Sequence, residues 1–238
     1  MFGFDPLTAA SLLILAGATP QNAASLCSPS PPAKINIIPK TLDLKYDYSR
    51  TLAQIQGQET DTIDPYGFHG MSMTQGFMQG QIKMVPRVKL GQEYLGKYQA
   101  ICLWYDTVDI VLEIDPMIVI GKEVYADRCM RQAVLDHEMK HVKVDRQIVN
   151  KYAKIMGQKV FDGLKERGFK VGPVKAESAQ QIATRMQKTV FQIVDHEYQK
   201  MALERTDAQR AVDNLQEYER VDALCPDFKD KRAKLMGK

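Results

Sequence analysis

The chain has 238 residues, with 32 Lys and Arg against 29 Asp and Glu and a formal net charge of +3. Hydrophobic residues make up 45% of it and charged residues 26%, which is typical of a globular protein and excludes a disordered or fibrous one. With so small a net charge, and no basic run interleaved with aromatic residues, we expect no nucleic-acid partner. The body of the chain has no apolar stretch of about 18 residues, so we expect no membrane insertion after signal removal.

Residues 1–26 have the character of a signal or lead-in segment. Residues 7–18 form an apolar run of signal-peptide length that ends in Ala-Gly-Ala, a small-residue pattern typical of a cleavage site. Residues 1–6 carry no Lys or Arg and include Asp5, which is unusual for such a segment. The alternative is an ordinary N-terminus. We predict a periplasmic or secreted protein in which residues 27–238 form a single domain.

The four cysteines, Cys27, Cys102, Cys129 and Cys225, form no Cys-x-x-Cys pair. An even number of cysteines in an exported chain predicts two disulfides. Three pairings are possible, and the spacing does not choose among them.

The front of the chain, residues 27–124, has the alternating hydrophobicity of β-strands. We expect strands over residues 42–48, over 82–90 with an interruption at Pro86, and over 108–114, followed by a turn at Asp115-Pro116 and a further strand at 117–120. Residues 57–80 contain five glycines and His69, which indicates a loop.

The back of the chain, residues 125–238, has helical periodicity. We predict a helix over about 127–167, a loop at 168–173 and a long helix over about 176–222. Strands followed by helices indicate an α+β fold.

The first of these helices contains His137-Glu138-Met139-Lys140-His141, the pattern His-Glu-x-x-His. Residues four apart on a helix lie one turn above each other, so both imidazoles can face one cation. The histidines belong to one inward stripe, which comprises Met130, Val134, His137, His141, Val144 and Ile148. Ring nitrogens on an apolar face need a partner, and a metal ion supplies one. The alternative is a pair of ordinary histidines that bind no metal.

A strand before a helix that carries His-Glu-x-x-His resembles the zincin metallopeptidases, and in particular bacterial secreted zinc-dependent protease-like domains. The resemblance covers about residues 100–225. It implies a small N-terminal β-sheet region followed by an active-site helix and a long antiparallel helix. It also implies a zinc ion (Zn2+) held by His137 and His141, a peptide or protein substrate, and hydrolysis in which Glu138 takes a proton from the attacking water. The chain has no Gly at the place where metzincins break the helix to bring in a third histidine, and the surroundings of Cys102 differ from those of the cysteine ligand in peptide deformylases.

A catalytic zinc usually has three protein ligands, so a third is needed. Asp145 is one turn beyond His141 and about 12 Å along the axis from His137, so it can orient or pair but cannot close the same site. Glu197 and Glu204 lie on the inward stripe of the second helix. In an antiparallel hairpin that turns at 168–173, Glu204 faces His137 and His141. Glu204 is therefore the predicted third ligand, as in the gluzincin arrangement.

Asp207, which follows on the same helix, is predicted to orient a ligand from the outer shell. We interpret His69 and His196 as structural or solvated residues. The sequence thus predicts a zinc-dependent hydrolase, most simply a peptidase. Its main alternative is an exported metal-binding or structural protein without catalytic activity.

Overall fold

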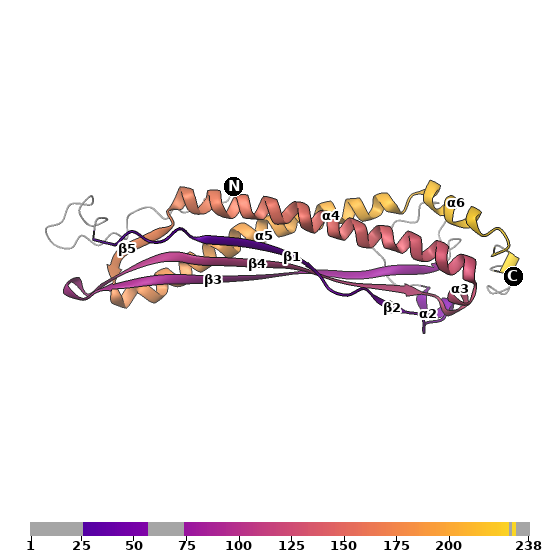
Figure 1. Ribbon diagram of the computed structural model, residues 1–238, viewed down its shortest axis with the longest axis horizontal. Coiled ribbons are helices and arrows are strands. Elements are labelled where there is room, and N and C mark those ends of the chain that lie inside the picture. The colour runs from indigo at the N-terminus through magenta and orange to yellow at the C-terminus, as the bar shows by residue number, and fades with distance from the viewer. Residues whose placement is uncertain (1–25, 57–73, 229, 232–238) are drawn as a thin grey trace. The chain divides into compact units, whose positions relative to one another are not determined.

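The computed structural model describes residues 26–56, 74–228 and 230–231 (Figure 1). Residues 1–25 of the predicted signal segment, and His69, lie outside them. The strands are β1 (Lys34–Thr41), β2 (Lys45–Asp47), β3 (Gly76–Leu95), β4 (Ala100–Ile120) and β5 (Lys170–Lys175). The helices are α2 (Leu52–Ile55), α3 (Lys122–Ala126), α4 (Arg128–Arg167), α5 (Ala179–Val212) and α6 (Leu215–Leu224), with short 3-10 turns at Gly96–Tyr98 and Ala176–Ser178. The mixture of helices with a five-stranded sheet confirms the α+β class.

The long strand β4 is the centre of the sheet. The path of the sheet is β1-β4-β2, and β3 and β5 also pair with β4. The side chains of β4 alternate between buried and half-buried along most of its 21 residues. One face of β4 is therefore committed to the hydrophobic core.

The chain forms two compact units, each assembled from three separated segments. Unit 1 contains Met1–Ile38, Met84–Leu112 and Tyr152–Gln199, and unit 2 contains Pro39–Lys83, Glu113–Lys151 and Lys200–Lys238. The long elements β3, β4, α4 and α5 contribute residues to both units. All three predicted motif residues, and the residues that contact them, belong to unit 2.

Unit 1 packs the second half of α4 and the first half of α5 against the sheet. Its core is lined by residues of β4, α4 and α5, which include Val108, Ile110, Val160, Leu164, Met186 and Val190. The buried Tyr105 hydroxyl donates to the backbone oxygen of Met186 at 2.9 Å, and burial raises the pKa of this phenol. A disulfide joins Cys27 to Cys102 within this unit.

Unit 2 packs the first half of α4 and helix α6 against the other half of β4. Its core includes Ile118, Val119, Val134, Val142, Val221 and Phe228. The carboxylate of Asp127 accepts from the backbone N–H groups of Cys129 and Met130 at 3.0 and 3.2 Å, and thereby caps the start of α4. A second disulfide joins Cys129 to Cys225. The prediction of two disulfides is confirmed, and the pairing that the sequence left open is now defined.

Several predicted boundaries differ from the observed ones. The predicted helix at 127–167 is α4 almost residue for residue. The predicted loop at 168–173 is wrong, because strand β5 occupies most of it. The predicted helix at 176–222 is two helices, since α5 ends at Val212 and α6 begins at Leu215. β3 and β4 continue through Pro86 and Pro116, because the fixed φ of proline is compatible with extended backbone.

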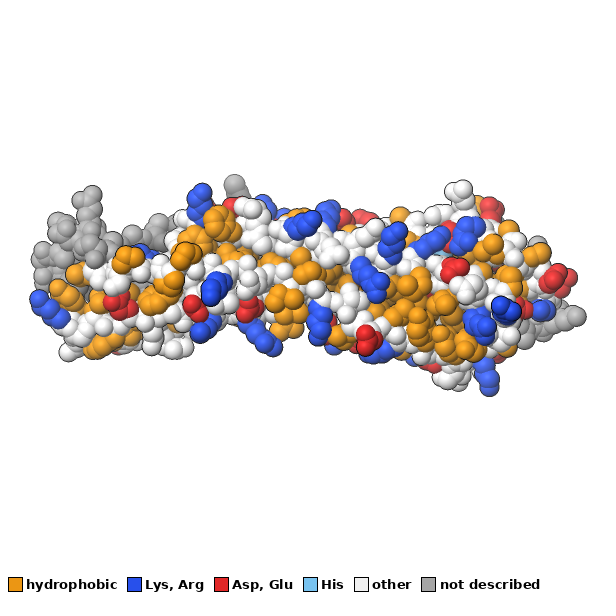
Figure 2. All heavy atoms as spheres, in the orientation of Figure 1, with side chains coloured by type: hydrophobic (Ala, Val, Ile, Leu, Met, Phe, Trp, Pro, Cys, Tyr) orange, Lys and Arg blue, Asp and Glu red, His pale blue; other side chains and the backbone are white. Residues whose placement is uncertain are grey.

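Within the described part of the chain, none of the helices combines the length and apolar character that crossing a membrane requires. On the face drawn in Figure 2, Lys and Arg side chains are scattered among hydrophobic and uncharged surface and do not gather into a single patch.

Candidate metal centre

Helix α4 presents the His-Glu-x-x-His segment to the interior of unit 2. The exposed fractions of His137, Glu138 and His141 are 8, 4 and 6%. These polar side chains are buried because their stripe continues the apolar one formed by Met130 and Val134, which are core residues. Buried polar groups need partners, and those of the two histidines come from the end of α5 and the start of α6.

The break between α5 and α6 places Asp213 opposite the histidines. Asp213 lies outside both helices, and Asn214 caps the next one by accepting from the backbone N–H of Glu217 at 3.0 Å. The side chain of Asp213 is 2% exposed. The chain therefore turns at this point in a way that directs a carboxylate inward.

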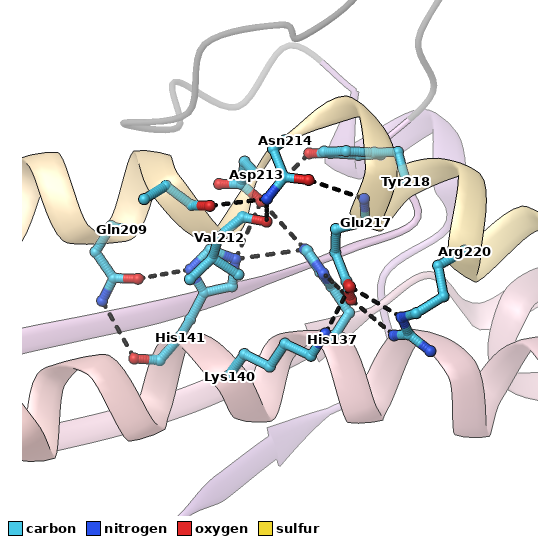
Figure 3. Close-up of polar contacts among 11 residues, drawn as sticks. His137, Lys140, His141, Gln209, Val212, Asp213, Asn214, Glu217, Tyr218 and Arg220 are labelled. Atoms are coloured by element: carbon cyan, nitrogen blue, oxygen red, sulfur yellow. Dashed lines mark hydrogen bonds and ion pairs between the residues drawn. The ribbon is translucent and has the colours of Figure 1, made fainter.

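Three side chains converge on one point (Figure 3). Oδ1 of Asp213 lies 3.1 Å from Nε2 of His137 and 3.2 Å from Nε2 of His141. The two Nε2 atoms are 3.4 Å apart. The Tyr218 hydroxyl is 3.4 Å from the same Oδ1. Two imidazoles and a carboxylate thus form a triangle of ligand atoms.

The size of this triangle fits a tetrahedral zinc ion. Bonds of about 2.0 Å from zinc to nitrogen or oxygen separate tetrahedral ligand atoms by about 3.3 Å, and the three observed separations lie between 3.1 and 3.4 Å. Within the described residues, Oδ2 of Asp213 is also buried without a hydrogen-bond partner. A buried carboxylate oxygen with no donor is costly unless a cation or water compensates it. The donor set and its spacing therefore suit a metal ion.

The other ring nitrogen of each histidine faces an oxygen. Nδ1 of His137 is 3.3 Å from Oε1 of Glu217, and Nδ1 of His141 is 2.6 Å from Oε1 of Gln209. Glu217 also contacts Lys140 at 2.5 Å and Arg220 at 2.7 and 2.9 Å. The hydrogen bond from Arg220, followed by that from Lys140, lowers the pKa of Glu217 to about 2, so this carboxylate is ionised at neutral pH.

Gln209 is in turn held by a buried ion pair. Its Nε2 donates to Oδ1 of Asp145 at 2.7 Å, and Asp145 accepts from Arg205 at 2.6 and 3.1 Å. The residue Asp145, predicted to orient or pair, is fully buried and reaches His141 through Gln209.

Glu138 lies beside the triangle but outside it. Burial raises the pKa of its carboxyl to about 7, against the opposing influence of the two neighbouring histidines, and the carboxylate accepts a hydrogen bond from the backbone N–H of Met78. A carboxyl group with such a pKa can both take up and release a proton near neutral pH.

The charges of the triangle are mutually supportive. Burial by itself lowers the pKa of His137 and of His141, yet the hydrogen bonds to Asp213, together with the negative charges of Glu138 and Asp213, outweigh it and raise the pKa of both. Burial alone raises the pKa of Asp213, and the hydrogen bonds and positive charges of the two histidines, when their rings are protonated, hold it below its usual value. The cluster therefore attracts positive charge, whether as protons or as a metal ion.

The structure does not bring Glu204 to the histidines. Both of its carboxylate oxygens accept from Lys151 at 2.6 Å, and Asp207 is exposed. The reason is the register of the two helices: the midpoint of His137 and Asp213 is residue 175, whereas the predicted hairpin was centred between 172 and 173. The chain forms β5 and a 3-10 turn before α5 begins, which displaces the register. Glu197 and His196 belong to unit 1.

The site residues that the sequence interpretation missed are Arg205, Gln209, Asp213 and Glu217. They recur at steps of four, the same spacing as His137, His141 and Asp145 on α4. The break that frees Asp213 also has a sequence signal, since Asn214 is followed three residues later by Glu217, as at a helix N-terminus.

Comparisons with protein-family models, with curated proteins and with solved structures found no match for this chain.

Proposed function

We propose that this chain is a zinc-dependent hydrolase, acting on peptide bonds, in which His137, His141 and Asp213 hold the metal. The observation that carries the proposal is the triangle of two imidazole nitrogens and one carboxylate oxygen at 3.1–3.4 Å, next to a buried glutamate. Two nitrogen ligands favour zinc over magnesium or calcium, which take oxygen ligands almost exclusively. Three protein ligands are the usual number in catalytic zinc sites.

When bound, zinc acidifies a coordinated water and polarises a substrate carbonyl. The chain supplies the proton carrier. Glu138 follows His137 directly, and its carboxylate, with a pKa raised to about 7, accepts the proton of the attacking water and transfers it to the leaving amine. A bound cation lowers this pKa and favours the ionised form that accepts the proton. The Met78 backbone N–H fixes the carboxylate.

The zincin-like character of the fold is part of the same proposal. It is supported by the order of elements around the site: strand β4 ends shortly before the helix that carries His-Glu-x-x-His, and a later helical segment supplies the third ligand. The proposed location is outside the cytoplasm, either periplasmic or secreted. The two disulfides support this, because such bonds persist in oxidising compartments.

One observation favours a second candidate, a metal site with a structural role. Each of the four site residues is at least nine-tenths buried: His137, Glu138, His141 and Asp213. A closed site is typical of structural zinc, which stabilises a fold without turning over a substrate. In that case the metal joins α4 to the segment between α5 and α6, and the protein serves as an exported binding or interaction module.

The experiment that separates the two candidates is the conservative variant Glu138→Gln. We expect it to retain zinc and fold, while peptidase activity on an unfolded protein substrate falls by about 10² or more. The matched control is Glu166→Gln on the same helix, whose side chain is 78% exposed and which we expect to be fully active. Zinc in the wild-type protein without any Glu138-dependent hydrolysis favours the structural role, and a wild-type protein without zinc contradicts both candidates.

A further inference from the structure

Both polar ends of the Gln209 side-chain amide form hydrogen bonds, although none of these contacts is to an atom of the proposed metal triangle. Its Oε1 lies 2.6 Å from Nδ1 of His141, and its Nε2 donates to Oδ1 of Asp145 at 2.7 Å and to the backbone oxygen of His141 at 3.2 Å. The residue is 7% exposed. A buried amide with three contacts has one preferred orientation.

That orientation is set by charge. The carboxylate of Asp145 accepts hydrogen bonds only, so it must face the NH₂ end of the amide. Arg205 holds Asp145 in place through two hydrogen bonds, and its Nη2 also donates to the backbone oxygen of Gly80 at 3.2 Å. Rotating the amide by half a turn brings its oxygen against a buried carboxylate and the His141 carbonyl oxygen, which is unfavourable. The amide oxygen therefore faces the imidazole.

We propose that Gln209 is a positioning residue that places the proton of neutral His141 on Nδ1 and leaves Nε2 as the free metal ligand. An amide oxygen is an acceptor, so at 2.6 Å it requires a donor on Nδ1. A neutral imidazole carries one proton, and its other nitrogen then presents a lone pair. That nitrogen, Nε2, lies 3.2 Å from the acceptor Oδ1 of Asp213, but the contact of Nδ1 with the amide oxygen is shorter, at 2.6 Å, and Asp213 has a second imidazole, His137, at 3.1 Å to donate to it. The inference rests on the proposed metal site.

Asp145 and Arg205 act through Gln209. This role explains why their ion pair is buried beside the site although it contacts none of the metal ligand atoms. Outer partners of this kind fix the tautomer and orientation of a ligating histidine, and their loss typically lowers metal affinity 10- to 100-fold. The corresponding partner of His137 is Glu217, at the longer distance of 3.3 Å. We therefore expect the shorter contact, that of Gln209, to control its histidine more strictly.

The test is ¹⁵N NMR of the histidine rings in the full-length protein, which contains four histidines. Spectra are recorded without metal at alkaline pH, where the rings are neutral, and again with one equivalent of zinc. In the wild type we expect His141 to be protonated on Nδ1 in both samples. In Gln209→Leu we expect a substantial fraction protonated on Nε2 without metal, and a zinc affinity about 10- to 100-fold lower.

One further variant serves as the control. Gln187→Leu removes a glutamine of the same helix that donates to the Val88 backbone at 3.3 Å in unit 1, and we expect it to change neither the tautomer nor the affinity.

The outcomes separate this inference from the proposed function. A Gln209→Leu protein that keeps the Nδ1 proton and binds zinc as tightly as the wild type overturns the inference. If that variant does not fold, a wild-type His141 protonated on Nε2 overturns it equally. A wild type with the Nδ1 tautomer that takes up no zinc supports the positioning of the imidazole and contradicts the metal site.

Discussion

Zinc is expected to stabilise unit 2 against unfolding, because its ligands are far apart in the sequence. Asp213 is 76 residues from His137 and 72 from His141. An unfolded chain does not hold such residues together, so the metal binds the native state almost exclusively and its binding free energy adds to stability.

The magnitude follows from linkage. At a free zinc concentration of about 1,000 times Kd, the free energy of unfolding rises by about 4 kcal/mol. For a chain of this size, about 1 kcal/mol shifts Tm by about 2–4 °C, so zinc should raise the Tm of the wild type by about 8–16 °C. If Asp213→Asn lowers zinc affinity at least about 100-fold, the metal stabilises that variant by at most about 1.4 kcal/mol, or about 3–6 °C in Tm, at the same zinc concentration.

Scanning calorimetry of chelated and zinc-loaded protein measures both shifts. The matched control is Glu204→Gln, since Glu204 pairs with Lys151 away from the site. We expect its response to zinc to equal that of the wild type. The reasoning is refuted if zinc leaves the wild-type Tm unchanged, or if it raises the Tm of Asp213→Asn by as much as that of the wild type.

Three further predictions concern pH, the ion pair beside the site and the cysteines. The pKa values of both site histidines are raised, and that of Glu138 is raised to about 7. The metal-free native state therefore holds more protons than the unfolded chain, and its Tm should decrease as the pH rises from about 5 to 8. The increase in Tm caused by zinc should become larger over the same range, because protons compete with the metal. Calorimetry that finds the opposite trends contradicts this. Asp145→Ala leaves Arg205 without its carboxylate partner and should lower the free energy of unfolding, measured in urea, by about 3–5 kcal/mol. The exposed control Asp207→Ala should change it by less than about 0.5 kcal/mol. Equal effects of the two substitutions refute the stabilising role of the buried ion pair. Thiol titration of the denatured, unreduced protein should find about zero groups per chain, and four groups contradict both bridges.

The local part of the site could be predicted from the sequence because one helix carries it. The spacing of His137, Glu138 and His141 fixes their relative positions once the segment is helical, and α4 has nearly the predicted bounds. The inward direction of both histidines followed from the apolar stripe that they continue, and both are buried.

The third ligand depends on which residues of two helices face each other, and that register is not a local property. The prediction of Glu204 assumed a short loop between the helices, where the chain instead forms strand β5. It also assumed one continuous helix, whereas the break after Val212 is what directs Asp213 inward. A disulfide could have set the register. Counting 12 residues inward from each end of the Cys129–Cys225 bridge gives His141 and Asp213, but the sequence left three pairings possible.

The strands show a similar limit. Pro86 and Pro116 were interpreted as interruptions, although β3 and β4 run through both. Proline removes a backbone donor but keeps a φ that extended chain tolerates, so its effect depends on whether that donor is needed by a neighbouring strand. The order of strands determines this, and alternation along one strand does not reveal that order.

Metal analysis of the purified protein, expressed with zinc supplied, tests the central claim most directly. We predict about one zinc per chain in the wild type and in Glu204→Gln, and loss of the metal in His141→Ala and Asp213→Ala. A wild type without zinc, or an Asp213→Ala protein that retains a full equivalent while Glu204→Gln loses it, contradicts the assignment of the site.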